Sequence, residues 1–240
     1  MLSKKQITAY VAEFFGTAIL TFSILAVSRS AVGVPYFVAI GVGATLAVLV
    51  MTIGQISGAH VNPAVTIGLW TVRKIKSLDA VLYIAAQFMG AVATFKLYEY
   101  LVAQGVQSIA PAQFDWKVLV AEILGTFVFS FGIASAVFHK YEGGKLAATI
   151  GGSLFLGVLL AGVASNGILN PAAALGVQSW DKAYVVGPII GAIIGFNLYV
   201  LLFAPEGSIK ALVAPTRKKS VSSSRTKTTT KTKAKTNKKK

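Results

Sequence analysis

The tripeptide Asn62-Pro63-Ala64 returns 108 positions later as Asn170-Pro171-Ala172, and each copy interrupts a long apolar stretch. Asn is a strong N-cap residue and Pro is favoured at the first helical position, so each copy predicts the start of a helix. The helical runs that follow, Ala64–Trp70 and Ala172–Ser179, are each only about 12 Å long at a rise of roughly 1.5 Å per residue. Because the hydrocarbon core of a bilayer is about 30 Å thick, both runs are predicted to enter a membrane without crossing it.

The composition is that of a membrane protein. The 240 residues are 55% hydrophobic and 13% charged, and the mean hydropathy is +0.69. The chain has no cysteine, which excludes disulfides and thiolate metal sites. The sequence shows no nucleophile–base set, metal cluster or cofactor motif, so we expect neither an enzyme nor a bound cofactor.

Six apolar stretches are long enough to cross a bilayer. They are Ile7–Val27, Pro35–Ile53, Ala80–Tyr100, Val118–Phe138, Leu146–Ala164 and Tyr184–Phe203. Their spacing leaves one short helical run inside each half of the chain.

The two halves share further landmarks. The motif Ala-Glu-x-x-Gly-Thr places Glu13 and Glu122 109 positions apart, within one residue of the spacing of the two Asn-Pro-Ala copies. Each half therefore holds three spans and one half-helix, and because three is odd, the second half must be inverted in the membrane. We predict an all-α membrane protein with six transmembrane helices and two re-entrant half-helices in an inverted repeat.

The predicted channel domain covers residues 1–204, with repeats at about 7–100 and 117–204, and a tail follows at 205–240. The tail holds 12 of the 23 Lys and Arg residues and a single acid, and its Lys/Ser/Thr-rich composition predicts disorder. Cytoplasmic termini put most basic loops on the cytoplasmic side, in accord with the positive-inside rule. We expect a multi-pass protein of the plasma membrane, with an internal membrane as the alternative.

Inverted insertion brings the N-termini of the two half-helices together near the middle of the bilayer. Non-helical backbone is tolerated there only if it is buried or lines a water-filled cavity. The amides of Asn62 and Asn170 would offer donors at one point, and both helix N-termini add partial positive charge. Such a constriction favours an oxygen lone pair and repels cations, protons included.

Over residues 7–204 the sequence resembles the aquaporin and aquaglyceroporin (major intrinsic protein) channels. The resemblance is carried by the paired Ala-Glu-x-x-Gly-Thr motifs, by residues 57–66, by Gln87 with Gly90-Ala91, and by Gly187-Pro188 with Gly191-Ala192. It implies passive transport of water or small neutral solutes, with one pore per subunit of a homotetramer in a lipid bilayer. It also implies that backbone carbonyls line the pore, at Gly58, Ala59, His60 and Val61 and at Asn166, Gly167, Ile168 and Leu169.

The implied selectivity filter departs from the family pattern. The family usually has an Arg three residues after the second Asn, where this chain has Ala173. The other filter positions, matched by their distance from the Asn-Pro-Ala copies, are Val42, Val158 and Gly167. A filter without Arg, His or aromatic rings is predicted to be wide and apolar, and the water and glycerol classes both stay open. Ile168 stands where the family mostly has a small residue, and it would narrow or reshape the outer half of the pore.

Two further hypotheses stay open. Glu13 and Glu122, with Gln87 beside them, either accept hydrogen bonds that hold the irregular loops or relay protons, and we favour the first. The relay would make the chain a proton-coupled secondary transporter, because inverted repeats also build transporters. The other hypothesis is a membrane scaffold with a vestigial pore, acting through attraction of the basic tail to anionic lipids. His60 either lines the inner vestibule or packs as a hydrogen-bonded side chain.

Overall fold

The computed structural model describes residues 2–30 and 34–206, and the predicted tail lies outside them from residue 207 onward. Within these residues, six helices are long and apolar enough to cross a membrane. They are α1 (Lys4–Ser28), α2 (Pro35–Ser57), α4 (Ser77–Val102), α5 (Trp116–Phe138), α6 (Gly143–Ala161) and α8 (Lys182–Phe203). The two short helices are α3 (Pro63–Thr71) and α7 (Pro171–Gly176). The predicted all-α membrane fold is confirmed.

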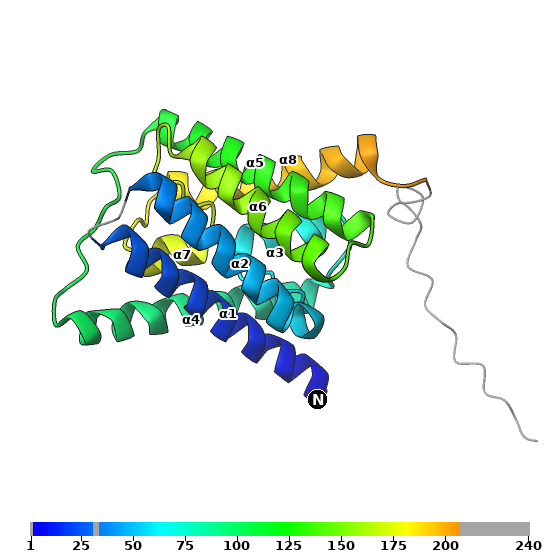
Figure 1. Cartoon of the computed structure of the whole chain (residues 1–240), viewed down its shortest axis with the longest axis horizontal. Coiled ribbons are helices and arrows are strands. Elements are labelled where there is room, and N and C mark those ends of the chain that lie inside the picture. The colour runs from blue at the N-terminus through cyan, green and yellow to red at the C-terminus, as the bar shows by residue number, and fades with distance from the viewer. Residues whose placement is uncertain (1, 31–33, 207–240) are drawn as a thin grey trace, which may run out of the picture.

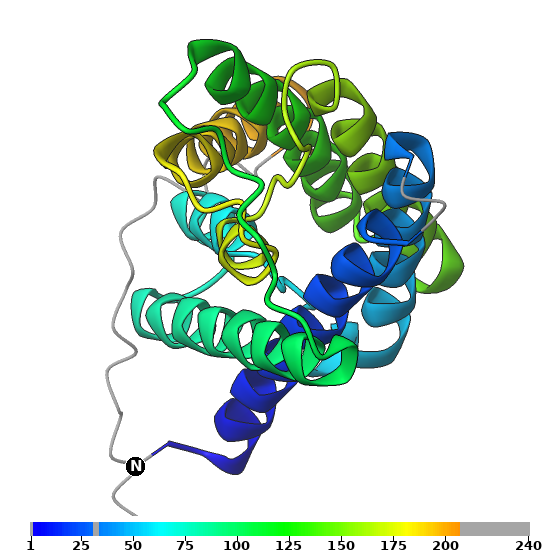
Figure 2. The same cartoon turned by 90° about the vertical axis from the view of Figure 1, so that its left-hand side faces the viewer.

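The long helices run together as one bundle with α3 and α7 between them (Figures 1 and 2). The N-terminal end of α1 and the C-terminal end of α8 lie at the same end of the bundle in Figure 1. An even number of spans requires this arrangement, whichever side of the membrane that end faces.

The two halves of the chain interlock through their half-helices. The half-helix α3 of the first repeat packs against α8 of the second, and α7 of the second repeat packs against α4 of the first. Each half-helix is therefore covered mainly by spanning helices of the other repeat.

Three helices end three or four residues away from the predicted C-terminal residue, and α1, α4 and α6 each begin three residues earlier than predicted. Helix α2 continues past Ile53 to Ser57, because Gly58 adopts the left-handed conformation (φ 93°) and its N–H donates to the Gly54 carbonyl at 2.9 Å. Helix α6 ends at Ala161, three residues before the predicted Ala164, where the chain turns away after Gly162.

Helix α7 ends at Gly176, although the sequence predicted Ser179. Gln178 takes a left-handed conformation with φ 62°, and the N–H of Ser179 reaches back to the Ala174 carbonyl at 2.8 Å. This is the Schellman pattern of helix termination. The left-handed position is usually a glycine, but here it is Gln178.

Candidate functional site

The two half-helices begin at their Asn residues. The side-chain oxygen of Asn62 accepts the Ala64 N–H at 2.8 Å, and that of Asn170 accepts the N–H groups of Ala172 and Ala173 at 3.0 and 3.2 Å. Each Asn thus satisfies backbone donors that the helix itself leaves open.

The same two side chains tie the tips of the half-helices together. The amide of Asn62 donates to the Leu169 carbonyl and the amide of Asn170 donates to the Val61 carbonyl, both at 2.8 Å. An Asn amide nitrogen carries two hydrogens, and each of these contacts uses one. The second hydrogen of each amide has no hydrogen-bond partner among the residues that the structure describes.

A fully buried carboxylate holds the loop before each tip. Glu13 accepts hydrogen bonds from the Ser57 hydroxyl at 2.7 Å and from the backbone N–H groups of His60 and Val61 at 2.9 and 2.6 Å. The loop therefore has its donors satisfied far from bulk water.

Glu122 repeats this arrangement in the second half. It accepts from the Ser165 hydroxyl at 2.8 Å and from the N–H groups of Ile168 and Leu169 at 3.0 and 2.7 Å. Glu13 has one more donor, the Gln87 amide at 2.7 Å. Counted from the matching Gly-Ala pairs, the position of Gln87 is taken in the second half by Pro188, which has no such donor.

The carboxylates stabilise a backbone that would otherwise be unfavourable. Val61 and Leu169 both have left-handed φ values, 42° and 54°. Such a conformation is rare for any residue other than glycine, most of all for the β-branched Val61, and costs on the order of 1–3 kcal/mol. The short hydrogen bonds from these two residues to Glu13 and Glu122 hold it in place. The geometry fits the loop-holding role that the sequence favoured for these carboxylates.

Three spaces lie in a row through the bundle. The first, here called the Val158 chamber, has a volume of about 270 Å³. It is lined from both repeats by residues that include Val38, Val42, Ile109, Val158, Asn166 and Gly167. Three predicted filter positions, Val42, Val158 and Gly167, thus come together on one chamber.

The second space, the Asn constriction, is much smaller, with a volume of about 10 Å³. Its lining includes Leu20, His60, Asn62, Phe129, Leu154 and Asn170. A water molecule needs roughly 10–15 Å³ measured in this way, so the constriction has room for about one. It adjoins the Val158 chamber through shared lining residues, Ile168 among them.

The third space, the Lys74 chamber, has a volume of about 210 Å³. Its lining includes Gly58, Ala59, Leu69, Lys74, Ile133 and Val137. It shares Leu46, His60 and Phe129 with the Asn constriction, so the three spaces lie next to one another along the bundle.

Other predicted residues take different positions. Ala173 is fully buried in α7 and is not among the residues that line the Val158 chamber. Leu169 packs its side chain toward Gly125 and Gly157, and its carbonyl is bound by Asn62. His60 combines both expected roles, since its ring lines the pore path while Nδ1 lies 3.2 Å from the Thr66 hydroxyl.

Most of the lining residues were not predicted from the sequence, and two of them, Ile109 and Lys74, lie in connections between helices. Ile109 lies in the connection between α4 and α5, where its N–H donates to the Gln178 carbonyl at 2.8 Å and its carbonyl accepts from the Asn166 amide at 3.0 Å. No local sequence pattern predicts such long-range contacts. Lys74 was visible in the sequence only as part of a basic loop.

Among the residues that line these three spaces, Lys74 carries the single charge. Glu13 and Glu122 are completely buried and do not line any of the three. The walls of the three spaces are therefore mostly apolar, with neutral polar groups that include Asn62, Asn166 and Asn170 and with one ammonium group.

Six spanning helices around two half-helices that meet tip to tip define a polytopic membrane channel. The family model "Major intrinsic protein" matches residues 1–199, and the chain belongs to that family. It is accordingly a passive channel for water and small solutes, and channels of this family are not enzymes.

Relatives and solved structures agree with this assignment. The chain is 35% identical over 206 residues to "Probable aquaporin NIP7-1" of Arabidopsis thaliana, covering 79% of this chain and 74% of the relative. It is 30% identical over 237 residues to "Aquaporin AqpM" of Methanothermobacter marburgensis, covering 80% and 96%. Its fold is similar to the X-ray structure of the aquaglyceroporin from Plasmodium falciparum, with a TM-score of 0.68, 21% identity, and coverage of 81% and 95%.

Proposed function

We propose that this channel conducts small uncharged solutes as well as water, and that it selects them by size at the Asn constriction. The observation that carries the proposal is the contrast in volume between the Val158 chamber, about 270 Å³, and the constriction, about 10 Å³. A chamber of about 270 Å³ has room for small solutes, so we place the sieve at the much smaller constriction.

Ile168 is the residue that we assign to the sieve. It lines both the Val158 chamber and the Asn constriction, and its N–H is fixed by Glu122 at 3.0 Å. A branched four-carbon side chain at this junction narrows the path, so that larger solutes pass more slowly than smaller ones. Its presence where the family mostly has a small residue is therefore a specific feature of this pore.

Selection by chemistry acts at the same place. The side chains of Asn62 and Asn170 line the constriction together with apolar residues that include Leu20, Phe129 and Leu154. A solute passes favourably when it offers a lone pair to the amides and an apolar edge to those apolar residues. Small neutral molecules with a carbonyl or hydroxyl oxygen meet both conditions.

Stopped-flow light scattering on proteoliposomes tests this proposal with water, urea and glycerol gradients. We expect Ile168→Ala to raise urea and glycerol permeability several-fold while water permeability changes less. Ile19→Ala is the matched control. It removes the same atoms from a residue of α1 that is 52% exposed and lines none of the three spaces. Unchanged urea and glycerol permeability in an Ile168→Ala protein that still conducts water would reject the assignment.

We further propose that the channel domain spans residues 1–204 and forms homotetramers in the plasma membrane with both termini in the cytoplasm. The basic segment 205–240 then faces anionic lipid, which attracts each nearby Lys or Arg by about 1 kcal/mol. Deletion of residues 216–240 should weaken binding to vesicles that contain phosphatidylserine and leave water permeability unchanged. Equal binding of the full chain to neutral and anionic vesicles would contradict the lipid role.

A further inference from the structure

We propose that Lys74 supplies the fixed positive charge that rejects cations from this pore, in place of the Arg that the family usually carries at the position of Ala173. The inference rests on the pore path through the three spaces described above. It assigns charge selection to the Lys74 chamber and leaves size selection at the Asn constriction.

The end of α3 fixes the position of Lys74. Arg73 takes a left-handed conformation with φ 55°, and the Lys74 N–H reaches back to the Leu69 carbonyl at 2.8 Å. This is the Schellman termination again, and it locks the backbone from which the Lys74 side chain extends. The ammonium group lies over the Phe138 ring at 4.2 Å from its centre, a cation–π contact that anchors it at the wall of the chamber.

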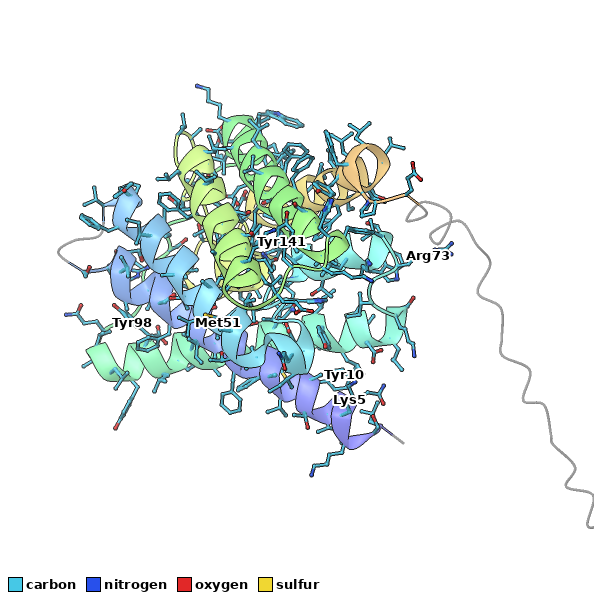
Figure 3. The ribbon with its side chains drawn as sticks, turned by 45° about the vertical axis from the view of Figure 1, so that its right-hand side comes forward. Lys5, Tyr10, Met51, Arg73, Tyr98 and Tyr141 are labelled. Atoms are coloured by element: carbon cyan, nitrogen blue, oxygen red, sulfur yellow. The ribbon has the colours of Figure 1, made fainter. Side chains whose placement is uncertain are left out.

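The charge lies at one end of the pore. Lys74 lines both the Lys74 chamber and the open groove outside it, which it shares with Trp70 and Lys76. Its neighbour Arg73 lies toward the same end of the bundle as Lys5, and Tyr98 lies toward the other end (Figure 3). A cation entering from this end meets Lys74 before it reaches the Asn constriction.

The charge is also uncompensated. Within residues 2–30 and 34–206, no carboxylate lies within ion-pair distance of the Lys74 ammonium. Burial lowers the pKa of Lys74 below its usual value, and the positive charge of Lys140 lowers it further. Apolar walls such as Leu69 and Ile133 keep the local dielectric constant low, which extends the reach of the field into the chamber.

The rest of the path offers no equivalent charge. The residues lining the Val158 chamber and the Asn constriction include no Lys, Arg, Asp or Glu. The guanidinium of Arg29 donates to the carbonyls of Gln107 and Val177 at 3.1 and 3.4 Å, and Arg29 does not line either space. The half-helix N-termini contribute only partial charges of about half a unit each.

Potassium flux into proteoliposomes, measured beside water permeability, tests the proposal. We expect Lys74→Gln to raise potassium flux about five- to tenfold at about 10 mM salt, and Lys74→Arg to behave like wild type. The difference should fade at about 1 M salt, where the Debye length shrinks from about 30 Å to about 3 Å. Lys76→Gln is the matched control, because Lys76 lies on the same loop and lines the outer groove but not the chamber.

The absence of native cysteines permits a second test within one protein. The Lys74→Cys variant has a single thiol, at position 74. Labelling this thiol with 2-aminoethyl methanethiosulfonate restores a positive charge, and labelling it with 2-sulfonatoethyl methanethiosulfonate adds a negative charge. We expect potassium flux to be lowest with the cationic label, intermediate without label and highest with the anionic label.

Several outcomes would overturn the inference. One is a Lys74→Gln protein that conducts water and has the same potassium flux as wild type. Another is an equal increase in potassium flux in Lys74→Gln and Lys76→Gln. Loss of water permeability in every variant lacking the charge would assign Lys74 a structural role instead. Failure of the size-selection proposal can be told apart from failure of this inference. It would leave urea permeability unchanged in Ile168→Ala, while the Lys74 variants would still differ in potassium flux.

Discussion

Gly43 of α2 and Gly151 of α6 lie back to back, and a Cβ atom added to Gly43 would fall 2.7 Å from the Gly151 carbonyl oxygen. The two residues are 108 positions apart, the same spacing as the two pore asparagines. The approximate two-fold axis of the inverted repeat therefore passes between two residues whose missing side chains allow the helix backbones to touch.

We predict that Gly43→Val or Gly151→Val destabilises the channel by about 1–3 kcal/mol or more, because the added atoms force α2 and α6 apart. Thermal unfolding in detergent would measure the loss. Gly152→Val is the control, since an added Cβ at this neighbouring residue meets nothing within 4 Å. Equal stability of the Gly151 and Gly152 variants would contradict a tight contact at the axis.

The carboxylates give a second prediction. Glu122→Gln replaces an acceptor oxygen by an amide that opposes the N–H groups of Ile168 and Leu169, so we expect a loss of about 2–4 kcal/mol in stability and a fall in water permeability. Glu142→Gln, at an exposed loop residue without a capping hydrogen bond, should change neither. A proton relay predicts a different result, in which stability is kept and proton-driven solute accumulation is lost.

Much of this architecture can be predicted from the sequence, because the patterns that indicate it are local or periodic. The Asn-Pro pairs mark helix starts through their own chemistry, and the spacing of Glu13 and Glu122 reveals the repeat without any structure. The helix ends are harder to predict. Gln178 and Arg73 adopt the left-handed conformation that ends a helix, and this conformation is usually predicted from a glycine.

The pore lining is the least predictable part. Ile109 reaches the Val158 chamber only through hydrogen bonds to Gln178 and Asn166, which lie 69 and 57 positions away. Lys74 lines a chamber because the turn after α3 brings its ammonium group over the Phe138 ring. Neither placement follows from periodicity, since both depend on the tertiary fold.

The filter assignment gives a third prediction. If Ala173 marks the lost filter position, then Ala173→Arg should narrow the Val158 chamber and lower urea and glycerol permeability several-fold. Ala173→Ser, which adds one oxygen and no charge, is the control. Unchanged permeability to both solutes in a folded Ala173→Arg channel would show that the position does not face the solute path.

The last prediction concerns pH. A lysine is charged below its pKa, and burial together with Lys140 lowers the pKa of Lys74 from the usual 10.5. The charge is therefore present at low pH and is lost as pH rises through that lowered value. We expect wild-type potassium flux to increase on going from about pH 7 to about pH 11, whereas Lys74→Arg stays flat because guanidinium keeps its proton.

The neighbours of Lys74 make the sign of this effect testable. The Phe138 ring faces the ammonium, Lys140 adds its charge from the turn after α5, and His60 lines the same chamber. Because Lys140 disfavours the charged form of Lys74, Lys140→Gln should move the alkaline increase in potassium flux to higher pH. A move to lower pH, or the same alkaline increase in wild type and Lys74→Arg, would show that another group controls cation entry.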